Sequence, residues 1–156
     1  MNFRSYKPAD LPQVIEVYSA SIRCLAAAYY TADQIAAWAP TKPDVARWQQ
    51  RLDSLHTIVA EDNGVLAGFA AYEKNGHLDF LFTHPEFVRR GVATQLYLKI
   101  ESVLRTAGIP EIFTEASLAA RPFFEHHGFR LDAEELVECR GARLRRFRMH
   151  KQISKA

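Results

Sequence analysis

The chain has 156 residues and a mass of 17.8 kDa, which is the length of one domain, and its 48% hydrophobic and 24% charged residues are typical of a folded globular protein. A formal net charge of +2 is too small to indicate a nucleic-acid or membrane partner by itself. Because Cys24 and Cys139 lie far apart and no long apolar run is present, we expect a single cytoplasmic domain over residues 1–156, without a disulfide scaffold or a membrane span.

The first third of the chain predicts a short strand followed by three helices. Residues 2–6 have strand character. Asp10 and Gln13 have the spacing of a capping box, and apolar residues follow at helical intervals up to Leu25. We predict a second helix, capped by Thr31, over residues 31–38, and a third over residues 43–54.

From His56 the hydrophobic period changes to two, which predicts three consecutive antiparallel strands. Two tight turns, Asn63-Gly64 and Asn75-Gly76, separate the segments 56–62, 65–73 and 77–83. Strict alternation along the third segment would place three side chains on each face of the sheet, namely Leu78, Phe80 and Phe82 on one, and Asp79, Leu81 and Thr83 on the other.

The second half of the chain alternates between helices and strands. An amphipathic helix is predicted over residues 92–107, a strand over 111–115, a helix over 118–127, and a strand pair around Gly141. This order predicts a mixed α/β (α+β) domain on a mostly antiparallel sheet of six to seven strands, flanked by four to five helices.

The junction between the third strand of that group and the helix at 92–107 has the pattern of an anion site. A helix N-terminus offers backbone N–H groups without partners and carries partial positive charge. Gly91 has no side chain to block an anion, Ala93 has a minimal one, and Arg89 and Arg90 add positive charge. These features predict a diphosphate site, although an ordinary tight turn with solvated arginines has the same local pattern.

Two segments in this order resemble the GNAT superfamily of acetyl-CoA-dependent N-acetyltransferases. The segment 88–93, VRRGVA, resembles the phosphate-loop pattern Gln/Arg-x-x-Gly-x-Gly/Ala, but Val88 stands where the pattern has Gln or Arg. The segment 120–129, ARPFFEHHGF, resembles the second signature, a helix that ends in Gly-Phe. The resemblance extends from Asp10 to the final strands, and it implies a GNAT-like fold.

By this resemblance, acetyl-CoA would lie in a V-shaped split between the strands at 78–83 and 111–115. Backbone groups of residues 81–83 would pair with the pantetheine arm, amides of residues 89–94 would hold the pyrophosphate, and the helix that contains Phe124 would line the other side. The implied cofactor-binding residues are Leu81, Phe82, Thr83, Arg89, Arg90, Gly91, Val92, Ala93, Thr94, Ala120 and Phe124.

The implied reaction is direct attack of a neutral primary amine, on a small molecule or a peptide, upon the thioester. It needs a base to deprotonate the ammonium, and we favour Asp79 or Glu115, with His77 and Glu73 as further candidates. Many family members use a tyrosine four residues before the Gly-Phe pair to protonate the thiolate. Phe124 occupies that position here and has no proton to give, so water, Ser117 or Tyr97 would have to substitute.

The family's acceptor wall corresponds to the aromatic segment that contains Tyr29, Tyr30 and Trp38, which we therefore predict as substrate-binding residues. Packing of this segment on the sheet is the alternative, and nothing in it names a substrate. We predict no metal site, because the adjacent His126 and His127 would point apart on a helix. The expected assembly is a monomer or a homodimer.

Two other functions remain open at this level. Residues 139–156 contain seven basic residues and no acidic one, which is the basis for a nucleic-acid-binding module. The same charges would also be explained by pairing with Glu134, Glu135 and Glu138 on a partner strand. Phe124 keeps open a GNAT-fold sensor that binds acyl-CoA without turnover.

Overall fold

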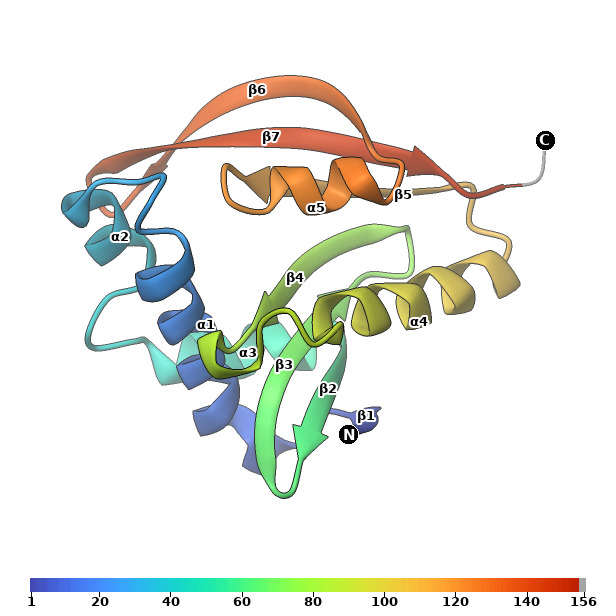
Figure 1. The fold of residues 1–156 in the computed structure, drawn as a ribbon, viewed down its shortest axis with the longest axis horizontal. Helices are drawn as coiled ribbons and strands as arrows, with labels where there is room; N and C mark the ends of the chain where they lie inside the picture. The colour runs from blue at the N-terminus through green and yellow to red at the C-terminus, as the bar shows by residue number, and fades with distance from the viewer. Residues whose placement is uncertain (155–156) are drawn as a thin grey trace.

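The computed structural model describes residues 1–154 and contains a seven-stranded sheet with the order β1-β2-β3-β4-β5-β7-β6 (Figure 1). The strands are β1 (Asn2–Ser5), β2 (His56–Asp62), β3 (Val65–Tyr72), β4 (His77–Thr83), β5 (Glu111–Ser117), β6 (Arg130–Cys139) and β7 (Ala142–Gln152). The helices are α1 (Leu11–Leu25), α2 (Ala32–Trp38), α3 (Val45–Asp53), α4 (Val92–Thr106) and α5 (Arg121–His126). Every pairing is antiparallel except that between β4 and β5. This confirms the predicted mixed α/β fold on a mostly antiparallel sheet.

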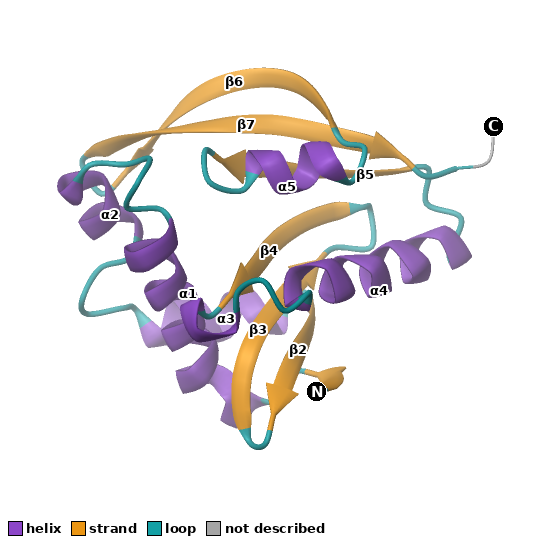
Figure 2. Cartoon of the chain, viewed as in Figure 1, coloured by secondary structure: helices purple, strands orange, loops and turns teal. Residues whose placement is uncertain are grey.

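Helices cover both faces of the sheet, as the ribbon in Figure 2 shows. On one face, α4 contributes Leu96, Tyr97 and Ile100 to a core that also holds Phe124 of α5 and Phe147 of β7. On the other face, the side chains of α1 and α3 pack on β2 and β3, through Val14, Val17, Leu52, Val59 and Phe69. The amphipathic patterns of α1 and α4 thus have a physical cause, because each helix buries one stripe against the sheet.

A β-bulge at Asp79 overturns the predicted alternation along β4. Ala71 of β3 pairs with Phe80, but the next residue, Tyr72, pairs with Leu78, so Asp79 is an extra residue in the strand. Leu78 consequently packs in the α4 core, whereas Phe80 packs against the α1–α3 core on the opposite face. The bulge turns the side chain of Asp79 toward α3, where it forms an ion pair with Arg51.

The sheet opens where β4 and β5 separate. These two strands pair only at His77 with Phe113 and at Leu78 with Thr114, and the Thr114 hydroxyl donates a hydrogen bond of 2.8 Å to the Leu78 carbonyl. From there the two strands diverge, and β5 continues along β7 instead (Figure 1). This divergence is the V-shaped split that the family resemblance implied.

Two local predictions at helix ends are corrected. The Asp10 side chain does not cap α1, because it accepts hydrogen bonds of 2.8 and 2.9 Å from the Arg4 guanidinium. Gln13 instead accepts a 2.9 Å bond from the Leu66 amide and so ties α1 to β3. The predicted Thr31 cap of α2 is confirmed, with Gln34 completing a capping box.

The predicted helix 118–127 is shorter in the structure. It begins at Arg121, with Pro122 in its first turn, where the missing N–H of proline costs nothing. Among residues 1–154, no helix is both long and apolar enough to span a bilayer.

Candidate active site

A cavity of about 370 Å³ lies beside the split between β4 and β5. Its walls come from the C-terminal end of α1, Trp38 of α2, the end of β4, the loop that leads to α4, the first turn of α4, the end of β5, and α5. All the residues predicted to bind the cofactor line it, with the exception of Arg90, and Ser117 lines it too. The structure therefore brings together four parts of the chain, namely residues 21–26, Trp38, residues 81–94 and residues 117–124.

The start of α4 forms an open cradle of backbone amides at one end of this cavity. Arg89 and Gly91 have φ angles of 62° and 77°, so left-handed residues flank Arg90, and such alternation points successive amides toward one concave side. The Gln95 amide makes the first intrahelical bond, to the Gly91 carbonyl at 3.0 Å, and no side chain caps the helix. The amides of Val92, Ala93 and Thr94 are thus left for a ligand.

The space beside the cradle fits a diphosphate. A Cβ atom built on Gly91 would meet nothing within 4 Å, so protein atoms do not plug this position. The helix dipole adds partial positive charge, and the Arg89 side chain lines the cavity. The open position at Gly91 and the positive charge beside it are what an anion held by backbone amides would need.

Arg90 lies away from this cradle. Its guanidinium lies 3.8 Å from an Asp62 carboxylate oxygen and 5.1 Å from the centroid of the Phe87 ring. The left-handed conformation of Arg89 turns the two neighbouring side chains in different directions. Sequence reasoning treated the two arginines alike because the conformation of a single loop residue is not visible in the sequence.

The edge of β4 that faces the cavity has no strand partner beyond Leu78 within residues 1–154. On its other edge, Leu81, Phe82 and Thr83 pair with Ala70, Phe69 and Gly68 of β3. An extended amide-containing ligand can pair with such an edge as an added strand does.

The position of the family's tyrosine and the two side chains that could protonate a leaving thiolate in its place differ clearly in their surroundings. Phe124 is 4% exposed and contributes to both the cavity wall and the core. Tyr97 is fully buried, and its hydroxyl donates to Glu101 at 2.7 Å, so it does not reach the cavity. Ser117 lines the cavity, and its Oγ accepts a 3.1 Å bond from the Ala120 amide, which leaves the hydroxyl proton available.

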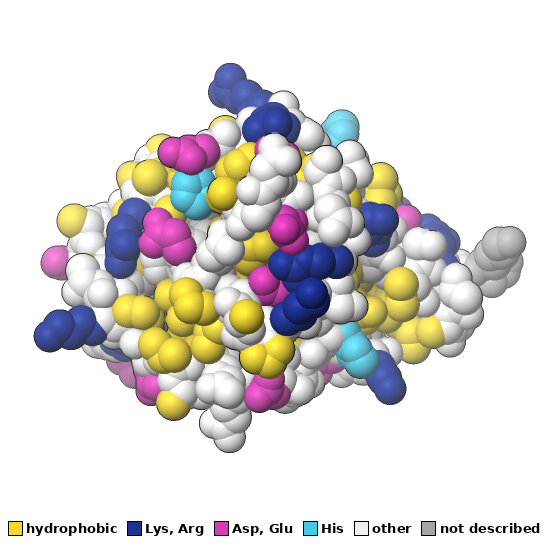
Figure 3. Space-filling model, turned by 90° about the horizontal axis from the view of Figure 1, so that it is seen from below, with side chains coloured by type: hydrophobic (Ala, Val, Ile, Leu, Met, Phe, Trp, Pro, Cys, Tyr) yellow, Lys and Arg dark blue, Asp and Glu magenta, His cyan; other side chains and the backbone are white. Residues whose placement is uncertain are grey.

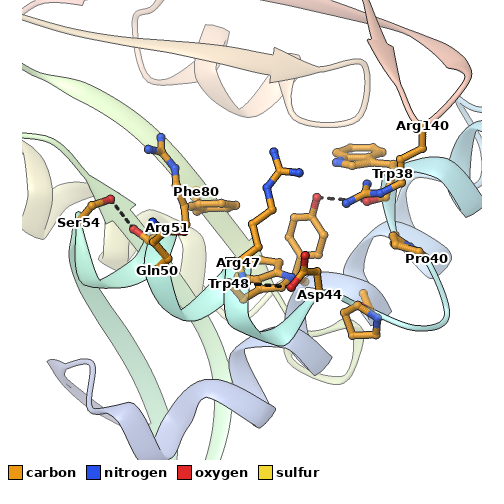
Figure 4. A pocket seen from close by; sticks show the side chains of 14 residues that line it. Trp38, Pro40, Asp44, Arg47, Trp48, Gln50, Arg51, Ser54, Phe80 and Arg140 are labelled. Carbon is orange, nitrogen blue, oxygen red and sulfur yellow. Dashed lines mark hydrogen bonds between the residues drawn. The ribbon is translucent and has the colours of Figure 1, made fainter.

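A second cavity, of about 530 Å³, lies on the α1–α3 face (Figure 4). Its apolar wall is made of aromatic rings, Tyr18, Trp38, Trp48 and Phe80, and its charged groups include Arg47, Arg51 and Arg140. Trp38 also lines the first cavity, so the two cavities meet at this side chain.

Of the three predicted substrate-binding residues, the structure places only Trp38 in a cavity wall. Tyr29 is 51% exposed and lines neither cavity. Tyr30 is buried, and its hydroxyl donates to the Arg145 carbonyl at 2.7 Å and accepts from the Leu118 amide at 2.9 Å. These bonds join the segment before α2 to β7 and the end of β5, which is a structural role.

A cluster of titratable side chains lies at the apex of the split. His77 Nε2 lies 2.7 Å from Glu115, and His77 Nδ1 lies 3.4 Å from Glu73. The hydrogen bond that the Glu115 carboxylate accepts raises the pKa of His77, and the same bond holds the pKa of Glu115 below its ordinary value. Arg51, which lines the second cavity, pairs with both Asp79 and Glu73.

Possible ligand atoms of His77, Asp79 and Glu115 all lie within 4.8 Å of one another, a spacing at which a metal ion could bind. Each of the three already has a protein partner, because His77 and Glu115 bond to each other and Asp79 pairs with Arg51. The arrangement is that of a hydrogen-bonded cluster of acids and bases, which suits proton transfer.

Sequence reasoning missed the arginines and Trp48 of the second cavity. The available signal was the helical spacing of Arg47, Trp48 and Arg51, which places them on one side of α3. The contribution of Arg140 depends on the β6–β7 turn reaching back to α2, and no local pattern carries that information.

Three of the seven basic residues of the C-terminal segment form ion pairs with carboxylates. Arg145 pairs with Glu134, and Arg146 pairs with Glu135 at 2.6 Å. Lys151 pairs with Glu101 of α4, also at 2.6 Å, while Lys155 lies outside the described residues. These pairs neutralise part of the charge on which a nucleic-acid-binding module rested, whereas Arg140, Arg143 and Arg148 form no ion pair with a carboxylate among the described residues.

Comparison with known proteins decides the family. The family model described as "Acetyltransferase (GNAT) domain" matches residues 26–152. The chain belongs to the GNAT acetyltransferase family. It is therefore an acyltransferase, and the GNAT-like fold expected from the two sequence signatures is confirmed.

Relatives of known structure or name agree with this assignment. The chain is 34% identical over 149 residues to the uncharacterized N-acetyltransferase YafP of Escherichia coli K12, covering 96% of this chain and 94% of the relative. A GCN5-related N-acetyltransferase structure from Rhodopseudomonas palustris superposes with a TM-score of 0.93 at 32% identity, covering 97% and 94% of the two chains. The PaiA N-acetyltransferase of Thermoplasma acidophilum, solved with coenzyme A, has a TM-score of 0.72 at 22% identity, covering 97% and 99%.

Proposed function

We propose that this GNAT domain transfers the acetyl group of acetyl-CoA to a primary amine of a small molecule or peptide by direct attack. The observation that carries the proposal is the continuity of the site: an open amide cradle, an unpaired strand edge and a second cavity meet around β4 and Trp38. Solved GNAT-fold proteins with bound coenzyme A, such as the PaiA N-acetyltransferase, support the choice of cosubstrate.

In this proposal the first cavity holds acetyl-CoA, whose thioester supplies the activated acyl group. The amides of Val92, Ala93 and Thr94 hold the pyrophosphate, and the free edge of β4 at Leu81–Thr83 pairs with the pantetheine arm. A backbone N–H on that edge also offers a fixed donor to the thioester carbonyl oxygen, where negative charge gathers during attack.

The acceptor enters from the opposite face, through the second cavity, and its amine must lose a proton before it attacks. Glu115 is the base that the cluster supports best, because its carboxylate is held ionised by His77 and the pair can pass a proton between them. Asp79 is paired with Arg51 and not with a group that can pass a proton on. Ser117 can donate a hydrogen bond to the departing thiolate, in place of the tyrosine that Phe124 replaces, and the thiolate then takes its proton from water.

Two measurements on the purified protein test the proposal. Titration with acetyl-CoA, followed by calorimetry or thermal shift, should show saturable binding and stabilisation. A panel of amines, polyamines, aminoglycosides and peptide N-termini should then reveal at least one acceptor that drives release of free CoA. Binding with no release across the panel would instead support a sensor without turnover, whereas no binding would overturn the placement of the cosubstrate.

A further inference from the structure

The second cavity carries an excess of positive charge that transfer to an amine does not require. Three arginines, Arg47, Arg51 and Arg140, line it, against one carboxylate, Asp44. Arg51 is neutralised by its ion pairs with Asp79 and Glu73. Asp44 caps α3, with its Oδ1 accepting a 3.1 Å bond from the Arg47 amide. Among the described residues, the side chains of Arg47 and Arg140 have no carboxylate partner.

The Arg140 side chain is exposed, and a hydrogen bond to the backbone anchors its guanidinium. It lies at the tip of the β6–β7 hairpin with a φ of 45°, and its Nη1 donates a 2.8 Å bond to the Ala37 carbonyl near the end of α2. This bond uses one of five N–H donors, so the planar group can still bind an anion. Figure 4 shows it beside Trp38, where the two cavities meet, with Arg47 rising from α3 between Trp38 and Phe80.

The wall between these charges suits an apolar body. Tyr18 packs edge-on against Trp48, with 4.7 Å between the ring centroids, and the centroids of Trp48 and Phe80 are 5.4 Å apart. The rings therefore form one continuous surface. Rings of this kind contribute contact area at small entropic cost, while a few polar groups fix orientation. Beyond Arg51, the carboxylates of Asp79, Glu73 and Glu115 supply negative charge at the apex of the split.

We propose that the acceptor is a small amine that also carries an anionic group, a carboxylate or a phosphate-type group, on an apolar or aromatic body. Arg47 and Arg140 bind the anion, the aromatic rings hold the body, and the amine points toward the carboxylates at the apex. This inference rests on the proposed function, because it names the acceptor of that same site. A polyamine or another polycation is excluded from the site by the two arginines.

The test uses matched acceptors that differ only in charge. 4-(Aminomethyl)benzoate, 4-(2-aminoethyl)benzoate and 6-aminohexanoate, amino acids in which the apolar body separates the amine from the anion, are each compared with the corresponding carboxamide, which keeps the amine and the body but removes the anion. The corresponding aminophosphonates separate a phosphate-type preference from a carboxylate preference. Release of CoA should be at least about tenfold more efficient, as kcat/KM, for an anionic member than for its carboxamide, as expected for charge-assisted hydrogen bonds from arginine.

Variants then assign the preference to the arginines. Arg47→Gln and Arg140→Gln should each raise the KM for the anionic acceptor about tenfold. The KM for the carboxamide should stay within about twofold of its value in the wild type. Arg130→Gln removes an exposed arginine at the start of β6 that lines neither cavity, and it should change neither value. Equal kcat/KM values for the carboxamides and the anionic acceptors would overturn the inference while leaving acetyl transfer intact. A preference for the anionic acceptors that persists in both variants would do the same.

A binding measurement covers the case in which no acceptor in the panel turns over. The two tryptophans of the chain, Trp38 and Trp48, both line the second cavity, so ligands there should change the intrinsic fluorescence. The anionic compounds should produce a saturable change that Arg47→Gln and Arg140→Gln weaken. If neither the amino acids nor the aminophosphonates bind more tightly than the carboxamides, the inference fails even when acetyl-CoA binds normally.

Discussion

The two cavities that meet at Trp38 are built in different ways. The one proposed for acetyl-CoA takes much of its lining from one continuous stretch, residues 81–94, and the contacts proposed for that ligand are largely with backbone groups. The one proposed for the acceptor takes side chains from α1, α2, α3, β4 and the β6–β7 turn, which are spread from Tyr18 to Arg140. Figure 3, a space-filling view from below, shows apolar and charged side chains side by side on the surface.

This difference shows which parts of the function tolerate sequence change. A backbone cradle needs only small residues and a helix start, so Val88 can replace the Gln or Arg of the family pattern without closing the cavity that it lines. An acceptor cavity made of side chains changes its chemistry with each substitution. The cofactor site is thus expected to resist side-chain changes that would alter the acceptor site.

The largest effect should come from the one change that breaks the cradle itself. Gly91→Glu places a negative side chain in the open space beside the amides and strains a residue whose φ is 77°. We expect the affinity for acetyl-CoA to fall by roughly a hundredfold or more, because the carboxylate competes for donors that bind the anion. Calorimetric titration measures this.

Gly64→Glu is the matched control for that change. Gly64 has a φ of 83° and open space around its Cβ position, but it lies in the β2–β3 turn, away from both cavities. It should show a comparable loss of thermal stability and an unchanged affinity for acetyl-CoA. Equal loss of affinity in both variants would mean that backbone strain, and not the cradle, explains the result.

The next largest effect should separate catalysis from binding at the apex. Glu115→Gln keeps the shape of the side chain but removes the base, so we expect kcat to fall by about 100-fold or more while acetyl-CoA still binds. Asp79→Asn, which removes a carboxylate already paired with Arg51, should cost less in kcat. The comparison uses initial rates of CoA release at saturating acetyl-CoA, and a reversed order of the two variants would assign the base to Asp79.

The same cluster predicts a dependence of stability on pH. The pKa of His77 is raised in the folded chain from 6.5, so its pairing stabilises the fold fully below pH 6.5 and less as the pH rises through the folded pKa. The pKa of Glu115 is lowered from 4.5, so its contribution is present above pH 4.5 and is lost on acidification. The difference in Tm between the wild type and His77→Gln should therefore be largest between pH 4.5 and pH 6.5. A difference that stays constant up to pH 9 would contradict the pairing.

The sequence predicted the elements because their signals are local, and the proposed cofactor side rests on signals of the same kind. The turns at Asn63-Gly64 and Asn75-Gly76, the helix periodicity and the small residues at 91 and 93 each act over a few positions. The bulge at Asp79 escaped prediction, because an extra residue in a strand is specified by its pairing with β3 and not by its own neighbours.

The acceptor side escaped prediction for a related reason. Tyr30 was expected to contact substrate, but its hydroxyl is used by Arg145 and Leu118, which are more than 80 positions away. Arg140 reaches the cavity only because a long hairpin folds back over α2. Such contacts depend on the assembled sheet, and aromatic composition alone did not distinguish a buried tyrosine from a cavity wall.

A smaller effect is expected at the position of the missing tyrosine. Phe124→Tyr adds a hydroxyl to a ring that forms both core and cavity wall, so kcat should stay the same or rise by up to about tenfold if the hydroxyl reaches the leaving thiolate. Thermal unfolding supplies the control. A marked drop in Tm would show that position 124 tolerates only an apolar ring and that the family's tyrosine has no place in this site.

The smallest predicted effect distinguishes the two adjacent arginines of the phosphate loop. Arg89 lines the cavity, so Arg89→Gln should weaken acetyl-CoA binding by about threefold, a modest change because the backbone amides supply most of the contact and an exposed charge is screened by solvent. Arg90→Gln should leave the affinity unchanged, because that guanidinium lies over Phe87 and beside Asp62. The affinities are compared by titration at low and physiological salt, and the effect of Arg89→Gln should shrink as salt is added. If Arg90→Gln had the larger effect, the left-handed turn at Arg89 would not persist with acetyl-CoA bound.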